Sequence, residues 1–502
     1  MKHSRLLWAL SLGCTLFWPA LTQSSQAAEK HLTLLFTNDT HNRLEPFQHV
    51  ELNQKVGGIV RRSHYLQKVR QENPLTVLLD AGDVFQGTPY YNFYLGEPDI
   101  KGMSYMGYHA MTVGNHDLDN GVSNLKKQMS YANFPVLNAN IVDEKTGKGV
   151  FKPYHIIETQ GLKIGVIGLM SEHAWQAVAS DHRQGYRLMD PFATANKIVP
   201  QLRPQVDLII SLHHMGIWDD EVYPQKVPGV DIILGGHSHT QMDHAKLIKN
   251  KNDNGLGGTL MQHAYYMGVY VGRIDIKLDT ESRKVLSYSS GLELMSDRYD
   301  AEPVQTMLNS YGDQLKSSMG QRIGESFDNM STDGKYDGPF ALGSLVADIL
   351  RVTQKAEIGI MNTGGVRSDL PKGPITVGKI YEIMPFDNAI TTFKMQGKDL
   401  REVVKTSVSR LGVSKNLQFS GLVYTLKDKQ VVSITHQGKP LEDNRWYTVS
   451  APTYVYDGNE AIAFDKAKEA SSSGQFIRDV LIDYVKKNPQ VKSPVDQRMI
   501  QQ

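Results

Sequence analysis

The chain has 502 residues, and its 54 lysine and arginine residues are balanced by 53 aspartate and glutamate residues, leaving a formal net charge of +1. This balance gives no electrostatic basis for binding a nucleic-acid polymer or an anionic bilayer, so we expect a small-molecule ligand. The length exceeds what one hydrophobic core usually supports, and two domains are therefore expected.

The N-terminus has the order of a secretory signal peptide. A positive stretch, Met1–Arg5, is followed by an apolar run, Leu6–Leu21, and then by the small residues Ala27 and Ala28. This order predicts a signal peptide over residues 1–28 and a periplasmic or secreted protein. The apolar run is interrupted by glycine and proline and is shorter than the ~20 apolar residues of a membrane span. An uncleaved anchor is therefore the less favoured alternative.

The only cysteine, Cys14, lies inside the expected signal peptide. The mature chain would therefore have neither disulfides nor a thiolate nucleophile. No later segment approaches the length of a membrane span, and we expect no stable membrane insertion.

From residue 31 onward, short aliphatic runs alternate with helical stretches. Runs of this kind, rich in valine, isoleucine and leucine, fit buried strands of a layered α/β domain. Polar residues gather where the runs stop, as is typical of sites at the ends of strands. The predicted strands are His31–Phe36, Leu75–Leu79, Leu162–Gly168, Val206–Leu212 and Val230–Leu234.

A helical pattern over Glu302–Met319 separates two α/β regions and ends at Gly320. We expect a first domain over residues 29–300, a linker helix over 301–320 and a second domain over 321–502. The second domain should contain a helix over Leu342–Thr353 and strands near Ile358–Met361, Val431–Thr435 and Tyr447–Ala451.

Five polar motifs follow predicted strands of the first domain. Any one of them alone is better explained as a cap, a turn or a hydrogen-bonded loop histidine. Together they supply carboxylates, imidazoles and an amide without sulfur, the ligand mixture expected for a pair of divalent ions such as Zn or Mn. The candidate ligands are Asp39, His41, Asp83, Asn115, His214, His237 and His239.

The predicted pair of metal ions indicates an enzyme that hydrolyses phosphate esters. A shared carboxylate, which we assign to Asp83, can hold two ions ~4 Å apart, and a water between them loses its proton near neutral pH. His116 is placed to face the phosphate, and Asp119 can orient its imidazole. His213 should point to the opposite face of its strand and be structural. His263 has no assigned role.

These motifs resemble those of the secreted 5′-nucleotidase and UDP-sugar hydrolase family within the calcineurin-like metallophosphoesterases. The resemblance covers nearly the whole mature chain and implies an α/β fold, a four-layer α/β/β/α sandwich followed by a smaller α/β nucleotide-binding domain. It also implies which residues bind each ion. The first ion is assigned to Asp39, His41 and His239, the second to Asn115, His214 and His237, the bridge to Asp83, and catalysis to His116 and Asp119.

The resemblance extends to the second domain. By themselves, a Gly-Gly turn and two aromatic residues are better explained as ordinary structure, but the family uses such segments to bind nucleotide. The implied substrate residues are Asn362, Gly365, Arg367, Phe386, Asn388, Tyr454 and Glu460.

Several positions depart from the family pattern. Asp117-Leu118 stands where the family usually has Glu-Phe, and Tyr454 and Glu460 replace a phenylalanine and an aspartate. A second arginine of the substrate site is missing, and Lys335 nearby could replace its charge but not its bidentate geometry.

The implied activity is metal-dependent hydrolysis of nucleoside 5′-monophosphates, extending to pyrophosphate bonds of nucleotide sugars or dinucleotides. The altered second-domain pocket leaves open another ester, such as a 2′,3′-cyclic nucleotide diester or a sulfur ester. A non-catalytic secreted nucleotide-binding protein is least favoured, because every matched ligand is retained. The sequence leaves the oligomeric state and the physiological metal open.

Overall fold

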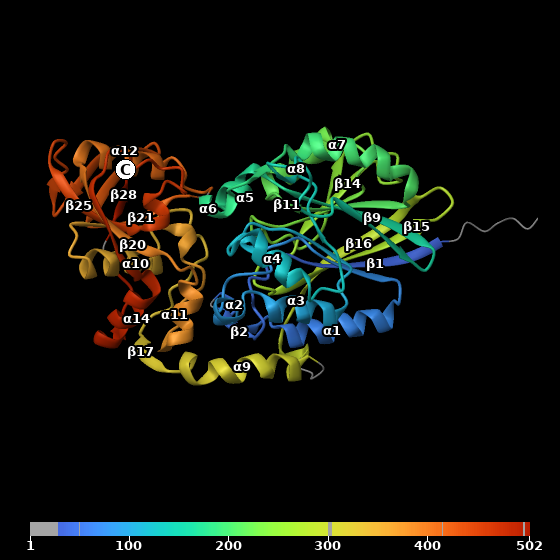
Figure 1. Cartoon of the computed structure of the whole chain (residues 1–502), viewed down its shortest axis with the longest axis horizontal. Helices are drawn as coiled ribbons and strands as arrows, with labels where there is room; N and C mark the ends of the chain where they lie inside the picture. Colours follow the sequence, from blue (N-terminus) through green and yellow to red (C-terminus); the bar gives the residue numbers. More distant parts are fainter. Residues whose placement is uncertain (1–28, 50, 300–303, 414, 495–496) are drawn as a thin grey trace, which may run out of the picture.

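The computed structural model describes residues 29–502 except 50, 300–303, 414 and 495–496. The predicted signal peptide lies outside this range. Figure 1 shows two bodies joined by α9 (Gln305–Met319), which runs along the edge where they meet. Within the described range, no helix is both long and apolar enough to cross a membrane.

The first domain is built on two six-stranded sheets. The first sheet has the strand order β16-β15-β1-β4-β5-β6, and the second has the order β13-β14-β12-β11-β9-β8. The first sheet contains β1 (Glu29–Thr37), β4 (Thr76–Asp80), β5 (Ala110–Thr112), β6 (Val136–Leu137), β15 (Tyr270–Asp279) and β16 (Lys284–Leu294). The second contains β8 (Tyr154–Thr159), β9 (Leu162–Met170), β11 (Leu208–His214), β12 (Ile232–Gly235), β13 (Lys246–Lys249) and β14 (Gly258–His263).

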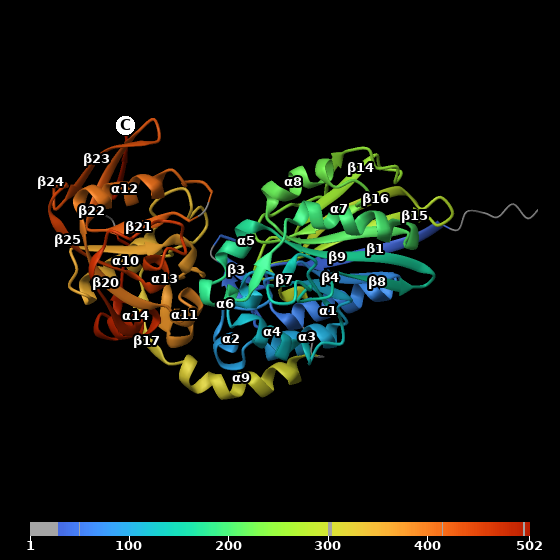
Figure 2. The same ribbon diagram turned by 45° about the horizontal axis from the view of Figure 1, so that its top comes forward.

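The two sheets pack face to face through an apolar layer. Leu34 and Phe36 of the first sheet share this buried cluster with Ile210 and Leu234 of the second. Separate buried clusters pack helices onto the outer face of each sheet, which gives four layers (Figure 2). The covering helices are α1 (Ile59–Glu72), α3 (Glu97–Met106) and α4 (Gly121–Met129) on one side, and α7 (Pro191–Leu202) and α8 (Ile217–Lys226) on the other.

The second domain is a smaller α/β unit around a five-stranded sheet with the order β21-β18-β25-β20-β26. These strands are β18 (Ile358–Asn362), β20 (Ala389–Gln396), β21 (Leu417–Ser420), β25 (Trp446–Pro452) and β26 (Lys468–Phe476). Its helices include α10 (Ala341–Thr353), α11 (Val377–Ile383), α12 (Gly397–Val408) and α14 (Ile477–Lys487). A four-stranded sheet with the order β24-β23-β22-β28 lies beside it and includes β22 (Leu422–Lys427) and β23 (Gln430–His436).

The predicted fold class is confirmed, as is every strand and helix proposed from the sequence. The α/β/β/α sandwich and the smaller second domain are both present, and the strand ends differ from the predicted ones by only a few residues. Buried aliphatic runs identify strands well because the interior of a parallel sheet is apolar on both faces.

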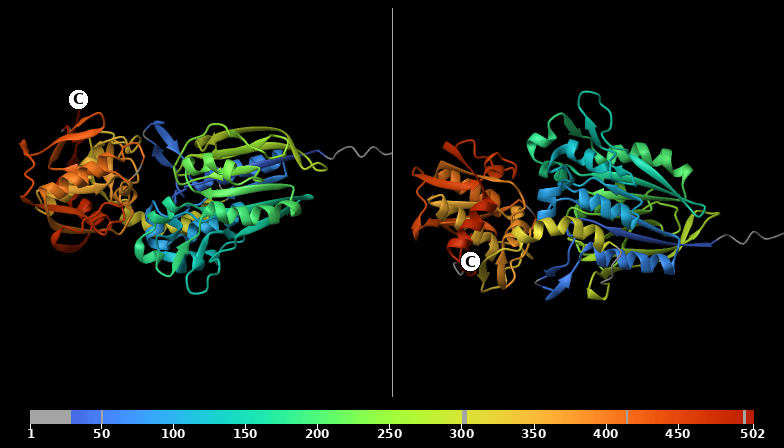
Figure 3. Two further views of the ribbon diagram at one scale, coloured as in Figure 1. Left: turned by 90° about the horizontal axis from the view of Figure 1, so that it is seen from above. Right: turned by 60° about the horizontal axis from the view of Figure 1, so that its bottom comes forward.

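The two domains touch along one face. Helix α2 (Pro89–Tyr94) of the first domain contacts both α9 and α11. Arg43 forms a 2.9 Å ion pair with Glu382 of α11, and the Asn92 amide donates to the Pro385 carbonyl at 2.9 Å. The views in Figure 3 show α9 spanning from one body to the other beside this face. A cavity lies between the domains and is lined by residues of both.

Candidate metal centre and substrate cavity

The polar motifs of the first domain meet because they follow neighbouring strands. Asp39 follows β1, Asp83 follows β4 and Asn115 follows β5, while His214 ends β11 and His237 follows β12. Strands β1, β4 and β5 pair in parallel, as do β9, β11 and β12, so their carboxyl ends face the same way. The sandwich therefore brings loops from both sheets to one edge.

The first metal-ligand group contains Asp39, His41 and His239, whose ligand atoms lie within 4.8 Å of one another. The Nε2 atoms of His41 and His239 are 3.1 Å apart, and His239 Nε2 is 3.4 Å from Asp39 Oδ1. Burial lowers the pKa of both histidines, so they are neutral and have a lone pair for a cation. The donors converge on one point and suit a divalent ion.

The second group contains Asp83, His214 and His237, again within 4.8 Å. His214 Nε2 lies 3.2 Å from Asp83 Oδ2 and 3.1 Å from the side-chain oxygen of Asn115. Its Nδ1 donates to the Ala81 carbonyl at 2.8 Å, which directs Nε2 toward the group. Although burial opposes protonation, the Asp83 carboxylate raises the pKa of His214 to about 10. The buried carboxylate thus requires a positive partner, and a metal ion would supply one while releasing the proton.

Asp83 lies in the second group, and its other oxygen accepts the main-chain N–H of His116 at 2.7 Å. Several predicted ligands also adopt left-handed backbone conformations that non-glycine residues seldom adopt, as is common at functional sites. They are Asp39, His41, Asp83, His237 and His239, with φ between 47° and 75°.

A buried carboxylate that the sequence left without a role, Asp117, holds the loops that carry the second group. It accepts main-chain N–H groups from Asp83 (3.1 Å), Val84 (3.0 Å), Phe85 (3.1 Å) and Gly114 (2.8 Å). Burial and the neighbouring charge of Asp83 raise the pKa of Asp117 to about 7. This carboxylate ties the loop after β4 to the loop after β5.

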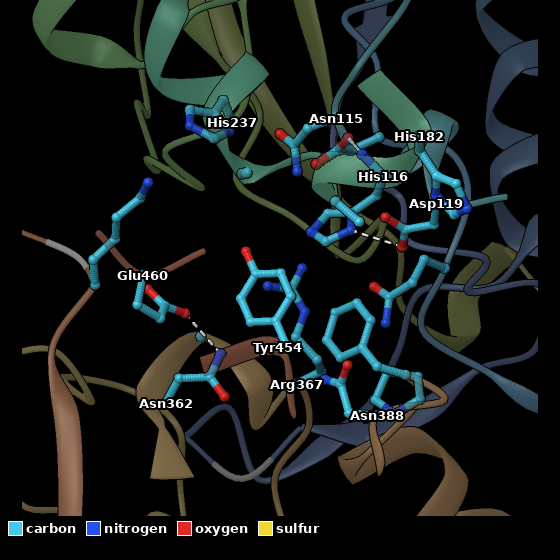
Figure 4. Close-up of a pocket in the computed structure, with 18 of the residues that line it drawn as sticks. Asn115, His116, Asp119, His182, His237, Asn362, Arg367, Asn388, Tyr454 and Glu460 are labelled. Atoms are coloured by element: carbon cyan, nitrogen blue, oxygen red, sulfur yellow. Dashed lines mark hydrogen bonds and ion pairs between the residues drawn. The ribbon is translucent and has the colours of Figure 1, made fainter. Parts of the chain in front are cut away.

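The predicted catalytic pair lies on the first-domain wall of the cavity. His116 Nδ1 is 2.9 Å from Asp119 Oδ2, and a dashed line in Figure 4 marks this contact. The ring of His116 is 5.6 Å from that of Phe386, which belongs to the other domain. Since Asp119 engages Nδ1, the second ring nitrogen of His116 is left for a ligand.

The cavity has a volume of about 560 Å³ and is lined by both domains. The second-domain wall includes six of the seven predicted substrate residues. Gly365 is the exception; it packs against Asn362 and Met361, and Gly364 lines the cavity instead. The six are Asn362, Arg367, Phe386, Asn388, Tyr454 and Glu460.

Polar contacts organise this wall. The Asn362 amide donates to Glu460 Oε1 at 2.7 Å (Figure 4). Arg367 reaches across the cavity until its Nη2 is 3.0 Å from His41 Nε2 of the first metal-ligand group. Lys335 donates to the Val366 carbonyl at 2.9 Å, and it is not among the residues that line the cavity.

Other residues that line the cavity belong to no predicted motif, among them His173, His182, Trp218, Tyr336 and Lys415. His173 lies in α5 (Glu172–Ala177), with Nδ1 only 2.7 Å from His237 Nε2. His173 and Trp218 closely follow the ends of β9 and β11, whereas His182, Tyr336 and Lys415 reach the cavity through the packing of helices and loops.

His213 points away from the metal-ligand groups, as predicted. Its Nδ1 is 2.7 Å from Asp220 Oδ1, and its Nε2 is 2.7 Å from the Ser211 hydroxyl. His263, which had no assigned role, lies 2.8 Å from the other oxygen of Asp220. Asp220 thus joins the ends of β11 and β14 in a fully buried network.

Comparison with known proteins agrees with this architecture. Residues 32–241 match the calcineurin-like phosphoesterase family, and residues 319–469 match the 5′-nucleotidase C-terminal domain. A 5′-nucleotidase of Vibrio cholerae is 29% identical over 93% of this chain and 91% of its own length. The protein UshA of Yersinia enterocolitica is 27% identical over 97% of this chain and 96% of its own length.

Solved structures show the same fold. A 5′-nucleotidase precursor from Thermus thermophilus superposes with a TM-score of 0.87 at 28% identity, covering 94% of this chain and 99% of that one. The sulfate thiohydrolase SoxB of Thermus thermophilus, 15% identical, has a TM-score of 0.80 over 94% of this chain and 96% of its own, a likeness of fold alone. With both family domains in order and the metal-ligand groups in the first of them, the chain is a hydrolase of the 5′-nucleotidase family of calcineurin-like metallophosphoesterases.

Proposed function

We propose that this enzyme hydrolyses nucleoside 5′-monophosphates to a nucleoside and phosphate. The observation that carries the proposal is one cavity shared by the two domains. One side is lined by Asp83, His237 and His239 of the metal-ligand groups and by the His116–Asp119 pair, and the other by Arg367, Tyr454 and Glu460. The phosphate and the base of a nucleotide differ in chemistry, so each would bind a different wall of this cavity.

The donor set suits two divalent ions, Zn, Mn or a similar metal. Bound there, the ions would supply a hydroxide near neutral pH and neutralise the phosphate oxygens. Asp83 is the proposed shared carboxylate. Asp39, His41 and His239 would hold the first ion, and Asn115, His214 and His237 the second.

The phosphate would lie between Arg367 and the metal-ligand groups. A guanidinium only 3.0 Å from His41 Nε2 would repel a dication, and an anion between them removes that repulsion. His116 would donate to the oxygen on which negative charge develops, while Asp119 fixes its ring through Nδ1. Both domains must be closed for these groups to act together.

The nucleoside would occupy the second-domain wall. Phe386 and Tyr454 offer aromatic faces to a base, and Asn388 lies beside Phe386. Glu460, held by the Asn362 amide, is placed to accept hydrogen bonds from ribose hydroxyls. Stacking is tolerant of base identity, so the site should accept several nucleotides.

The missing second arginine favours a second candidate, hydrolysis of a different ester by the same metal centre. Lys335 is engaged by the Val366 carbonyl, and the cavity has Lys415 on another part of its wall. Cyclic nucleotide diesters, sulfur esters, and the pyrophosphate bonds of nucleotide sugars or dinucleotides belong in the same substrate panel. On the signal-peptide pattern, we place the enzyme in the periplasm or outside the cell.

The test is phosphate release from AMP by the purified protein with Mn or Zn added. His116→Ala should lower kcat by about 10²- to 10⁴-fold, the usual range for an acid–base group, while the bound metal is unchanged. His155→Ala, at a half-buried histidine of β8 outside the cavity, is the matched control. A metal-loaded protein that cleaves another ester but not AMP would establish the second candidate instead.

A further inference from the structure

We propose that His173 is a positioning residue for the metal ligand His237: its Nδ1 accepts the Nε2–H of His237, so that His237 binds its ion through Nδ1. The inference rests on the proposed two-metal function and deepens it. It concerns a residue that the strand-end motifs do not include.

The contact between the two rings is close. His173 Nδ1 lies 2.7 Å from His237 Nε2, and the ring centroids are 4.9 Å apart at 64°. The His173 ring also meets Trp218 edge to face at 5.4 Å, and Trp218 in turn lies 6.3 Å from the His237 ring. Both His173 and Trp218 line the cavity. The three rings therefore form one cluster beside the second metal-ligand group.

A hydrogen bond between two imidazoles requires one N–H and one lone pair. A nitrogen that binds a metal has its lone pair committed and carries no proton. His237 can therefore keep this contact and bind an ion only if Nε2 carries the proton and Nδ1 faces the ion. A second partner of this kind commonly fixes the tautomer and ring orientation of a metal-bound histidine.

The surroundings of His237 are consistent with this assignment. Its main-chain N–H donates to both oxygens of the Asp39 carboxylate, at 3.2 and 3.0 Å. Its ring lies 5.1 Å from the ring of His214, which belongs to the same metal-ligand group. His214 shows the complementary arrangement, with Nδ1 donating to Ala81 and Nε2 turned inward.

His173 accepts this hydrogen bond through the lone pair of Nδ1, so that nitrogen carries no proton.

Because His173 belongs to α5, the placement of this helix would affect metal binding by His237. Helix α5 and the residues after it reach the cavity, where Ala177 and Ala179 also form part of the wall. Removing the acceptor should free the His237 ring to rotate and weaken only the ion that His237 binds.

The experiment compares His173→Phe, which keeps a ring against Trp218 without an acceptor, with His173→Asn, whose amide oxygen can replace Nδ1. Binding of Co²⁺ to the full protein is measured by equilibrium dialysis and by the visible absorption of the bound ion. We expect His173→Phe to weaken one of the two sites by about 10- to 100-fold, the usual effect of losing such a partner, and His173→Asn to recover much of it. His155→Phe, the same change outside the cavity, should bind like the unmodified protein.

Unchanged affinity of both sites in His173→Phe would overturn the inference. A raised KM for AMP with unchanged Co²⁺ binding would also overturn it, because His173 would then contact substrate. If the phenylalanine variant folds poorly by circular dichroism, His173→Ala takes its place in the same comparison with His173→Asn. Failure of the unmodified, metal-loaded protein to release phosphate from AMP would instead refute the proposed function and leave the dialysis result interpretable.

Discussion

Replacing Asp117 by asparagine tests whether one buried carboxylate organises the loops of the metal centre. In the structure its two oxygens accept four main-chain N–H groups at 2.8–3.1 Å, including that of Asp83. Each carboxylate oxygen of Asp117 accepts two of these N–H groups. Asparagine keeps one oxygen and places an amide nitrogen, which cannot accept, where the second oxygen was. Two buried N–H donors therefore lose their acceptor.

Each buried donor left without an acceptor costs about 1–3 kcal/mol, which gives about 2–6 kcal/mol in total. Asparagine also removes a charge that is costly to bury beside Asp83, as the raised pKa of Asp117 shows. This gain offsets part of the loss, and we expect a net destabilisation in the lower half of that range. Urea unfolding followed by circular dichroism measures it, and metal analysis should show weaker binding at the second group.

Asp117→Glu is the matched control, because it keeps the charge and both oxygens and differs by one methylene. It should be less destabilising than Asp117→Asn. An asparagine variant as stable as the unmodified protein, with full metal content, would refute the view that these four hydrogen bonds hold the loops in place.

Three further outcomes are expected. Gly114→Ala should lower activity by about 10²-fold and reduce metal content measured by atomic emission, because a Cβ there would lie 2.2 Å from Asp83 Oδ1 and displace it. Phe386→Ala should raise KM for AMP by about 5- to 150-fold, the equivalent of ~1–3 kcal/mol of stacking. The KM for p-nitrophenyl phosphate, which has no nucleobase, should change little. An equal rise in KM for both substrates would contradict a stacking role. Glu382→Gln should favour domain opening, because Arg43 would lose its charged partner at 2.9 Å. We expect a larger radius of gyration in X-ray scattering and a KM for AMP raised about tenfold, the equivalent of ~1.4 kcal/mol. Although burial favours the protonated form, the charges of Lys379 and Arg43 lower the pKa of Glu382 to about 2. In the unmodified protein, the stabilisation from this ion pair is therefore fully present above about pH 4.5 and is lost as the pH falls toward 2.

The sequence alone determined the fold class and the candidate metal ligands. Buried aliphatic runs such as those around Leu34 and Ile210 are typical of strands covered on both faces. The ligands could be found because each lies within a few residues of a strand end, as Asp39 and His214 do. Local order along the chain carries this information, and no distant contact is needed to read it.

Only the tertiary structure decided which groups surround those ligands. The roles of Asp117 as a loop anchor and of His173 as the neighbour of His237 depend on contacts that only the folded chain makes. The same holds for Gly364, which lines the cavity where Gly365 was expected, and for the meeting of Arg367 with His41 across the domains. These contacts join residues far apart in the chain. Whether they form depends on the direction of each side chain and on how the two domains pack, and no local sequence pattern encodes either.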